Sequence, residues 1–270
     1  MSLKDLMVHL DEGERTKVRL EIAVSIARQH QARLLGVFGQ RAEPGQAEII
    51  ASWPGKEYLA AAQSSKAQFE KASAGLAQAE WHDVNRGGDA ELLRKITDIA
   101  RYSDLILLGQ HDDSVKAHVP PELPEEIVLN SGRPVLLIPY IGDFSPFFQH
   151  PLIAWNKSRE AAHAVNDAIP LIESCREATI MSLDTLHDEA AASCAELAGH
   201  LARHGIKSKS DILIVDDIGI MDMLLNRVTD RDADLLVMGA HGQIGFPFLS
   251  RGAGTRHILR HMTVPVLMSN

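Results

Sequence analysis

The stretch Asp234-Leu235-Leu236-Val237-Met238-Gly239, near the C-terminal end of the chain, has the apolar pattern of a buried strand and ends in glycine. Further glycines follow, then a segment of helical character at 256–262 and a second apolar run at 264–268. Glycine allows close approach of a backbone to a ligand, and the first turn of a helix favours an anion. Residues 239–270 include three arginines and no Asp or Glu. The stretch therefore predicts a strand, a glycine loop, a helix and a strand that together can hold phosphate.

The spacing of the glycines is more specific than their number. Two residues separate Gly239 from Gly242, and nine separate Gly242 from Gly252. This pattern resembles the nucleotide loop of the universal stress protein family, G-x2-G-x9-G followed by Ser or Thr. Ala253 stands where that family usually has the hydroxyl residue, and Thr255, two positions further on, can supply a hydroxyl instead. The apolar runs on either side of the loop resemble the family's fourth and fifth strands.

The chain also contains an internal repeat. Residues 101–111 align with residues 231–241 at a constant offset of 130, and Pro134-Val135-Leu136-Leu137 aligns with Pro265-Val266-Leu267-Met268 at 131. Two copies of one strand-and-loop pattern indicate a tandem duplication. Strands alternate with helices in both copies, which predicts parallel sheets covered on both faces. We expect an α/β protein with two doubly wound domains, residues 1–145 and 146–270, the segment 141–150 being the joint between the copies.

Helical periodicity and capping residues define the expected helices. These cover residues 15–30, 57–79, 90–102, 158–172, 188–204, 218–229 and 256–262. Ser158 is expected to cap its helix. Residues 39–55, which contain two prolines and three glycines, predict an irregular loop that is absent from the second copy.

The resemblance implies a Rossmann-like fold of the adenine nucleotide alpha hydrolase type and a bound adenine nucleotide, ATP with AMP or ADP as alternatives. The residues that carry over to the second copy as nucleotide-binding residues are Asn156, Gly239, Gly242, Gly252, Ala253 through its backbone, and Thr255. Asn156 follows the first strand of that copy, where the family usually has Asp. Its amide can donate and accept hydrogen bonds, but asparagine is also a common turn former, and both interpretations stay open.

The first copy lacks the features of a phosphate loop. Asp112 stands where the second copy has Gly242, and the place of the next glycine falls within residues 120–126, which contain three prolines and three glutamates. Carboxylates repel phosphate and proline has no N–H to donate. The first copy is therefore predicted not to bind nucleotide. Asp11 matches the family's acidic residue, and we interpret it as a helix cap or turn residue.

Composition excludes several classes of function. The net charge of −9 argues against a general nucleic-acid binder, and two cysteines are too few for a disulfide framework. No apolar run reaches membrane-spanning length and the N-terminus does not resemble a signal peptide, so we expect a soluble, cytoplasmic protein. His200 with His204, and His257 with His261, have a spacing that can hold a metal, but neither pair has a third ligand nearby in sequence. The preferred interpretation is surface histidines or, for the second pair, electrostatic partners of phosphate, and no metal is expected.

Two hypotheses for function follow. The first is a stress-response regulatory protein that binds ATP or a related nucleotide in its C-terminal domain. The alternative is a scaffold of the same fold that binds no nucleotide and acts through a protein partner that the sequence does not identify. No catalytic motif is present, so slow ATP hydrolysis is an option without a catalyst that we can name. The resemblance further implies that residues 135–138 and 264–268 pair as an intramolecular pseudo-dimer, and a homodimer of chains is left open.

Overall fold

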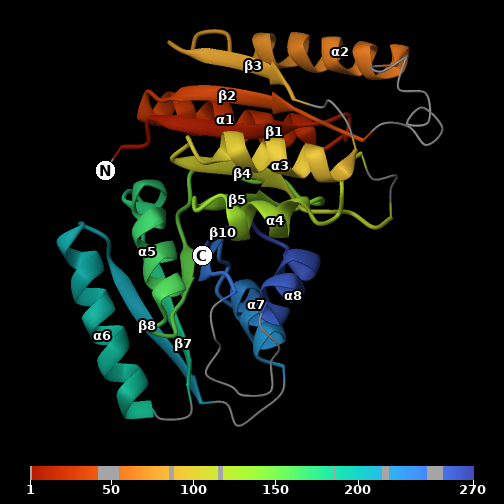
Figure 1. Cartoon of the computed structure of the whole chain (residues 1–270). Helices are drawn as coiled ribbons and strands as arrows, with labels where there is room; N and C mark the ends of the chain where they lie inside the picture. The colour runs from red at the N-terminus through yellow and green to blue at the C-terminus, as the bar shows by residue number, and fades with distance from the viewer. Residues whose placement is uncertain are drawn as a thin grey trace. The chain divides into compact units, whose positions relative to one another are not determined.

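The computed structural model describes residues 2–41, 55–84, 88–114, 118–184, 187–214, 219–241 and 252–270 (Figure 1). The chain forms two compact units, Ser2–Arg133 and Pro134–Asn270, which we call the N-terminal unit and the C-terminal unit. The compact units meet at a different residue from the boundary expected at 145, because strand β5 pairs with β10 inside the C-terminal unit. The expected boundary follows the duplication in the sequence and stays a prediction.

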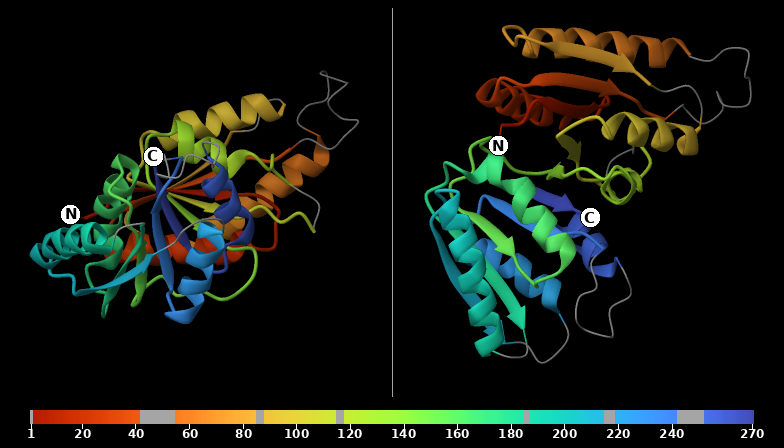
Figure 2. Two further views of the ribbon diagram at one scale, coloured as in Figure 1. Left: turned by 90° about the horizontal axis from the view of Figure 1, so that it is seen from below. Right: turned by 60° about the vertical axis from the view of Figure 1, so that its left-hand side comes forward.

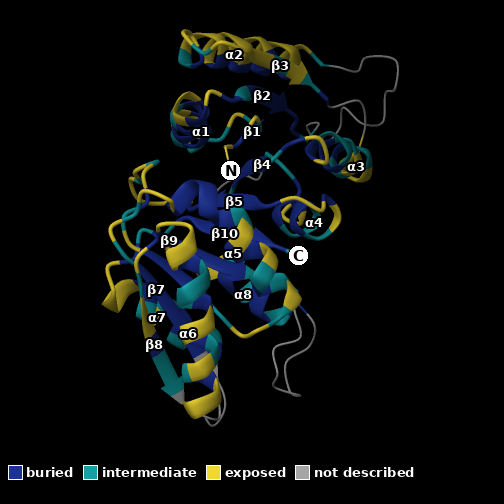
Figure 3. Cartoon of the chain, turned by 90° about the vertical axis from the view of Figure 1, so that its left-hand side faces the viewer, coloured by how far each residue is buried: buried dark blue, intermediate teal, exposed yellow. Residues whose placement is uncertain are grey.

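The N-terminal unit contains a parallel sheet with the strand order β3-β2-β1-β4. Its strands are β1 (Asp5–Leu10), β2 (Arg33–Phe38), β3 (Ala79–Asp83) and β4 (Leu105–Gly109). Its helices are α1 (Thr16–His30), α2 (Lys56–Ala72), α3 (Asp89–Ala100) and α4 (Leu123–Asn130). Strands β1, β2 and β4 are buried along almost their whole length, as expected when helices cover both faces of a parallel sheet. Figure 3 shows α1 on one side of these strands and α3 and α4 on the other.

The C-terminal unit contains a sheet with the strand order β5-β10-β9-β6-β7-β8. Its strands are β5 (Val135–Ile138), β6 (Pro151–Ala154), β7 (Ala178–Asp184), β8 (Ser208–Ile214), β9 (Leu235–Gly239) and β10 (Val266–Ser269). Its helices are α5 (Arg159–Ile172), α6 (His187–Arg203), α7 (Ile220–Asp230) and α8 (Ala253–His261). All neighbouring strands are parallel except β5 and β10, and α5 and α6 lie on the same face of the sheet (Figure 2).

The two units repeat one another, since β2-β1-β4 corresponds to β7-β6-β9. The register is also the same: Leu6 is opposite Leu105 in the first unit, and Pro151 is opposite Leu235 in the second. This confirms the expected doubly wound α/β fold. In the described part of the chain, no helix combines the length and the apolar character needed to cross a membrane.

Three helices differ from the sequence-based expectation. Helix α8 begins at Ala253, three residues before the expected start at 256. The helix expected at 57–79 ends at Ala72, and Gly75 then takes a positive φ of 93° that a helix cannot continue. Helix α4 was not expected, because the proline-rich run was interpreted only as a lost phosphate loop. Pro124 lies in the first turn of α4, where its missing N–H costs no hydrogen bond.

The last strand of each copy forms one antiparallel pair. Val266 is opposite Leu137, Leu267 is opposite Leu136, and both pairs are buried. The expected pairing of the two final strands is therefore confirmed. Whether the two domains as a whole form a pseudo-dimer stays a prediction.

We predict that Leu267→Ala lowers the free energy of unfolding by about 2–5 kcal/mol, because it leaves a cavity in a fully buried strand pair. Urea titration of the full chain measures this loss. As a control, Tyr102→Ala, at a side chain that is 80% exposed, should change the stability by no more than about 0.5 kcal/mol. Equal effects of the two substitutions on stability would contradict the burial of the β5–β10 strand pair.

Candidate functional site

The candidate site lies at the carboxyl ends of β6 and β9 in the C-terminal unit. These strands are parallel neighbours, with Ile153 opposite Val237, so the segments that follow them leave the sheet at the same edge. From β6 the chain continues to β7 on one side, and from β9 it continues to β10 on the other. The strand order thus reverses between β6 and β9. In open α/β sheets, ligands bind in the crevice formed at such a point.

Gly239 is the last residue of β9, and the start of helix α5 lies directly against it. A Cβ atom at this position would come within 2.5 Å of the Ala161 backbone nitrogen and 2.6 Å of the Glu160 carbonyl carbon. No side chain fits at this distance, so glycine is required for α5 to pack on the sheet. The close approach that the sequence indicated therefore serves the fold, whatever the site binds.

Gly252 immediately precedes helix α8 and adopts a left-handed conformation with φ of 82°. A Cβ here would meet the imidazole ring of His241, coming within 2.5 Å of Nδ1. Both the backbone angle and the neighbouring ring therefore require glycine. Ala253 begins the helix, and the first turn of α8 contains no acidic residue. The N–H groups of such a turn have no acceptor within the helix and can bind an anion.

Thr255 connects the end of β9 to the start of α8. Its hydroxyl oxygen accepts a hydrogen bond of 2.9 Å from the backbone N–H of His241, and the residue is 3% exposed. His241 itself has a positive φ of 54°. The Thr255 oxygen thus joins the first turn of α8 to the second residue after β9. A direct contact of this hydroxyl with a ligand stays a prediction.

Asn156 forms the turn between β6 and α5. Its side-chain oxygen accepts a hydrogen bond of 3.1 Å from the N–H of Ser158, and Lys157 between them has a positive φ of 59°. Ser158 then caps α5, as predicted, by accepting a hydrogen bond from the N–H of Ala161. These contacts favour the turn-forming interpretation of Asn156. Gly242, the remaining predicted binding residue, lies outside the described residues.

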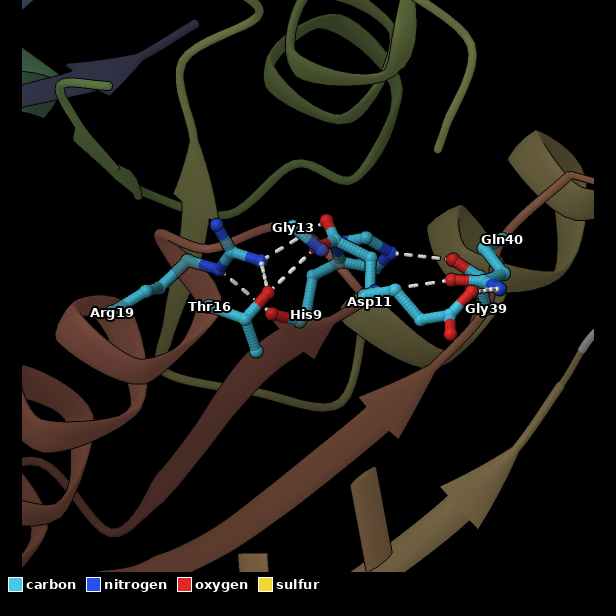
Figure 4. A network of polar contacts seen from close by, with 8 residues as sticks. His9, Asp11, Gly13, Thr16, Arg19, Gly39 and Gln40 are labelled. Carbon is cyan, nitrogen blue, oxygen red and sulfur yellow. Dashed lines mark hydrogen bonds and ion pairs between the residues drawn. The ribbon is translucent and has the colours of Figure 1, made fainter. Parts of the chain in front are cut away.

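The same edge of the N-terminal unit is filled by its own side chains. Asp11 accepts hydrogen bonds from the Gly13 N–H at 2.7 Å and the Thr16 hydroxyl at 2.6 Å, and the Arg19 guanidinium donates to it at 3.2 Å (Figure 4). Asp11 is therefore the turn residue that the sequence predicted. Arg19 was missed, although a charged residue within the apolar stripe of a helix is a signal that could have drawn attention to it.

Burial and charge set the ionisation of this cluster. Burial opposes the ionisation of Asp11, but Arg19, His9 and the hydrogen bonds from Thr16 and Gly13 outweigh it and lower its pKa to about 2. For His9, burial lowers the pKa to about 4, and the partial compensation by Asp11 does not restore it. His9 Nε2 lies 2.8 Å from the Gly39 carbonyl oxygen, so the neutral ring carries its proton on Nε2.

Comparison with known proteins agrees with this architecture. Residues 176–270 match the model of the universal stress protein family. This part of the chain is a universal stress protein domain. The matched region includes the glycine loop and strands β9 and β10 on either side of that loop. Strand β6, the first strand of the second copy, precedes the matched region. No curated protein matches the sequence.

Several solved structures resemble the chain over its whole length, including the following two. One is a universal stress protein from Archaeoglobus fulgidus DSM 4304, with 16% identity, a TM-score of 0.73 and 98% of each chain covered. The other is a functionally unknown protein from Pseudomonas aeruginosa PAO1, with 14% identity and a TM-score of 0.58, covering 99% of this chain and 92% of that one. At these identities the likeness establishes the fold. It extends the universal stress protein fold to the N-terminal unit, which the family model does not match.

The buried histidine predicts how stability depends on pH. With a pKa near 6.5 when unfolded and about 4 when folded, His9 takes up a proton more readily in the unfolded chain between these values. The free energy of unfolding should therefore fall as the pH drops from about 6.5 to about 4, by up to about 1.4 kcal/mol per pH unit. Urea titration of the full chain across this range measures the slope.

The variant His9→Gln should reduce this slope, because glutamine can still donate to the Gly39 carbonyl but does not titrate. The control His82→Gln, at an exposed histidine of the same unit, should leave the slope unchanged. An unchanged slope in His9→Gln would show that other groups cause the pH dependence.

Proposed function

We propose that the C-terminal unit binds an adenine nucleotide, with ATP as the first candidate and AMP or ADP as alternatives, and that the protein serves stress-response regulation. The observation that carries this proposal is the junction of β9 and α8. A left-handed glycine and a helix start without acidic residues lie there, beside the point where the strand order reverses. Each of these features favours a phosphate group.

In this proposal the phosphates are bound by backbone groups. The N–H groups of Ala253 and the two residues after it belong to the first turn of α8, and the left-handed Gly252 sets the path of the backbone into that turn. Arg256, in the next turn, adds a positive charge on the same helix. Asn156 lies beyond the neighbouring strand, where it can contact the ribose or the base. The proposal is one of binding and assigns no residue to hydrolysis.

A scaffold without nucleotide is the second candidate, and three observations favour it. Asn156 uses its side-chain oxygen in its own turn, and Thr255 uses its hydroxyl oxygen to hold His241. Ala253 offers no hydroxyl at all. In this alternative the unit would present its surface to a protein partner, and the glycines would be kept for the close packing that they allow.

The asymmetry of the two units predicts one nucleotide per chain. In the N-terminal unit the corresponding edge is filled by Arg19 and Asp11, and Asp112 accepts two hydrogen bonds from Ser114 where the second copy has a glycine. Calorimetric titration of the full chain with ATP should give a stoichiometry near one. Two sites would show that the N-terminal unit also binds, and the absence of binding would favour the scaffold.

The sharpest test is Gly252→Val, which should weaken ATP binding by more than about tenfold, or about 1.4 kcal/mol. Valine disfavours the positive φ and would press on the His241 ring, displacing the start of α8. Gly205→Val is the matched control in the same unit: Gly205 has a φ of 78°, but nothing lies within 4 Å of its Cβ position. Both variants carry backbone strain, and only the first should lose affinity. Equal affinities in the two folded variants would remove the main support for nucleotide binding.

A further inference from the structure

Arg19 is a buried arginine whose guanidinium is held by three oxygen atoms of different kinds. Its Nε donates to the His9 carbonyl at 2.8 Å, and its Nη2 donates to Asp11 Oδ2 at 3.2 Å and to Thr16 Oγ1 at 3.0 Å. Only 3% of the residue is exposed. The Thr16 hydroxyl in turn donates to the other oxygen of Asp11. The oxygens therefore form a pre-oriented set of acceptors around a planar cation (Figure 4).

The guanidinium lies against the end of β4. A Cβ at Gly109 would collide with Arg19 Nη1. The register of the strands makes Gly109 the counterpart of Gly239, where the obstacle is instead the backbone at the start of α5. At equivalent places in the two units, the backbone of helix α5 packs against the end of β9 and the charged side chain of Arg19 packs against the end of β4.

The second copy has no such cation. Arg19 comes eight residues after Asp11, and the residue eight positions after Asn156 is the buried Ala164. The first copy therefore has both the carboxylate and the arginine, and the second copy has neither at the equivalent positions. If the cation at Arg19 occupies a site formed around Asp11, the two residues should be present or absent together, because a buried carboxylate without a counter-charge is costly.

We propose that Asp11, Thr16 and the His9 carbonyl form a guanidinium-binding site, and that Arg19 fills it as a ligand built into the chain. In the N-terminal unit, the side chain of Arg19 thereby occupies the space at this edge of the sheet, and no external ligand is needed to fill it. The site recognises a planar, forked cation by geometry and charge together, which a simple ammonium cannot satisfy equally well. This proposal concerns the N-terminal unit and does not rest on nucleotide binding in the other.

The variant Arg19→Ala tests the proposal by emptying the site in the full-length chain. We expect a lower thermal midpoint and faster hydrogen–deuterium exchange in peptides covering residues 5–20. Methylguanidinium at millimolar concentration should reverse both effects in a saturable manner. At equal ionic strength, methylammonium should bind roughly tenfold more weakly because it has the charge without the fork. Methylurea, with a similar shape and no charge, should have no effect.

Matched variants separate a binding site from a general response to the additive. The wild type should not respond to methylguanidinium, because its site is filled. Arg33→Ala removes an arginine that pairs with Asp5 and Glu80 at the surface of the same unit, and it should not be rescued. The double variant Asp11→Asn with Arg19→Ala should lose the rescue. Equal rescue of the double variant, or no preference for methylguanidinium over methylammonium, would overturn the proposal.

If Arg19→Ala does not fold alone, its recovery on refolding becomes the measurement. Methylguanidinium should restore soluble protein and methylammonium should not, whereas failure of both would contradict the proposal. Arg19→Lys is a second variant that keeps the charge and the stem. It should remain folded with faster exchange in residues 5–20, and exchange equal to wild type would show that the forked geometry is not recognised.

Discussion

Gly109 and Gly239 each end a central strand, and in each case the volume that a side chain would occupy is already filled. At Gly239 it is filled by the backbone of Glu160 and Ala161, and at Gly109 by the guanidinium of Arg19. The duplicated sheet depends on this contact, because it fixes how the first helix of each unit lies on the strands. The glycine is the same in both copies, yet what it makes room for differs. One residue type thus permits either a tightly packed helix or a buried ion pair.

The ion pair has a different energetic character from the helix contact. Moving Asp11 and Arg19 out of water carries a desolvation cost, and their attraction compensates for it only because Thr16, Gly13 and His9 supply the remaining hydrogen bonds. Removing one partner would leave the other charge buried, which typically costs about 3–5 kcal/mol. Such a cluster adds less to stability than its short distances suggest, but it strongly favours one arrangement of the strand end.

The sequence predicted the fold well because its signals are local and repeated. The apolar runs before Gly109 and Gly239 indicate buried parallel strands, and the capping of α5 by Ser158 follows from residue type alone. The internal arrangement of the sites was not predictable in the same way. That Arg19 turns back to Asp11, or that Thr255 bonds the N–H of His241, depends on which strand lies beside which helix. Pair contacts of this kind are specified by the tertiary fold, and a single sequence without its strand order does not contain them explicitly.

The position of Thr255 limits how the C-terminal unit can recognise a phosphate group. Ala253 and Thr255 are two residues apart on a helix, which places their side chains on nearly opposite sides of it. A hydroxyl at 255 therefore does not lie where one at 253 would, and its oxygen accepts a hydrogen bond from the N–H of His241 in a nearly buried position. If a nucleotide binds here, backbone N–H groups at the start of α8 have to provide most of the recognition. Such recognition depends on the path of the backbone, which is why the left-handed glycine at 252 has more influence on the proposed site than any hydroxyl near it.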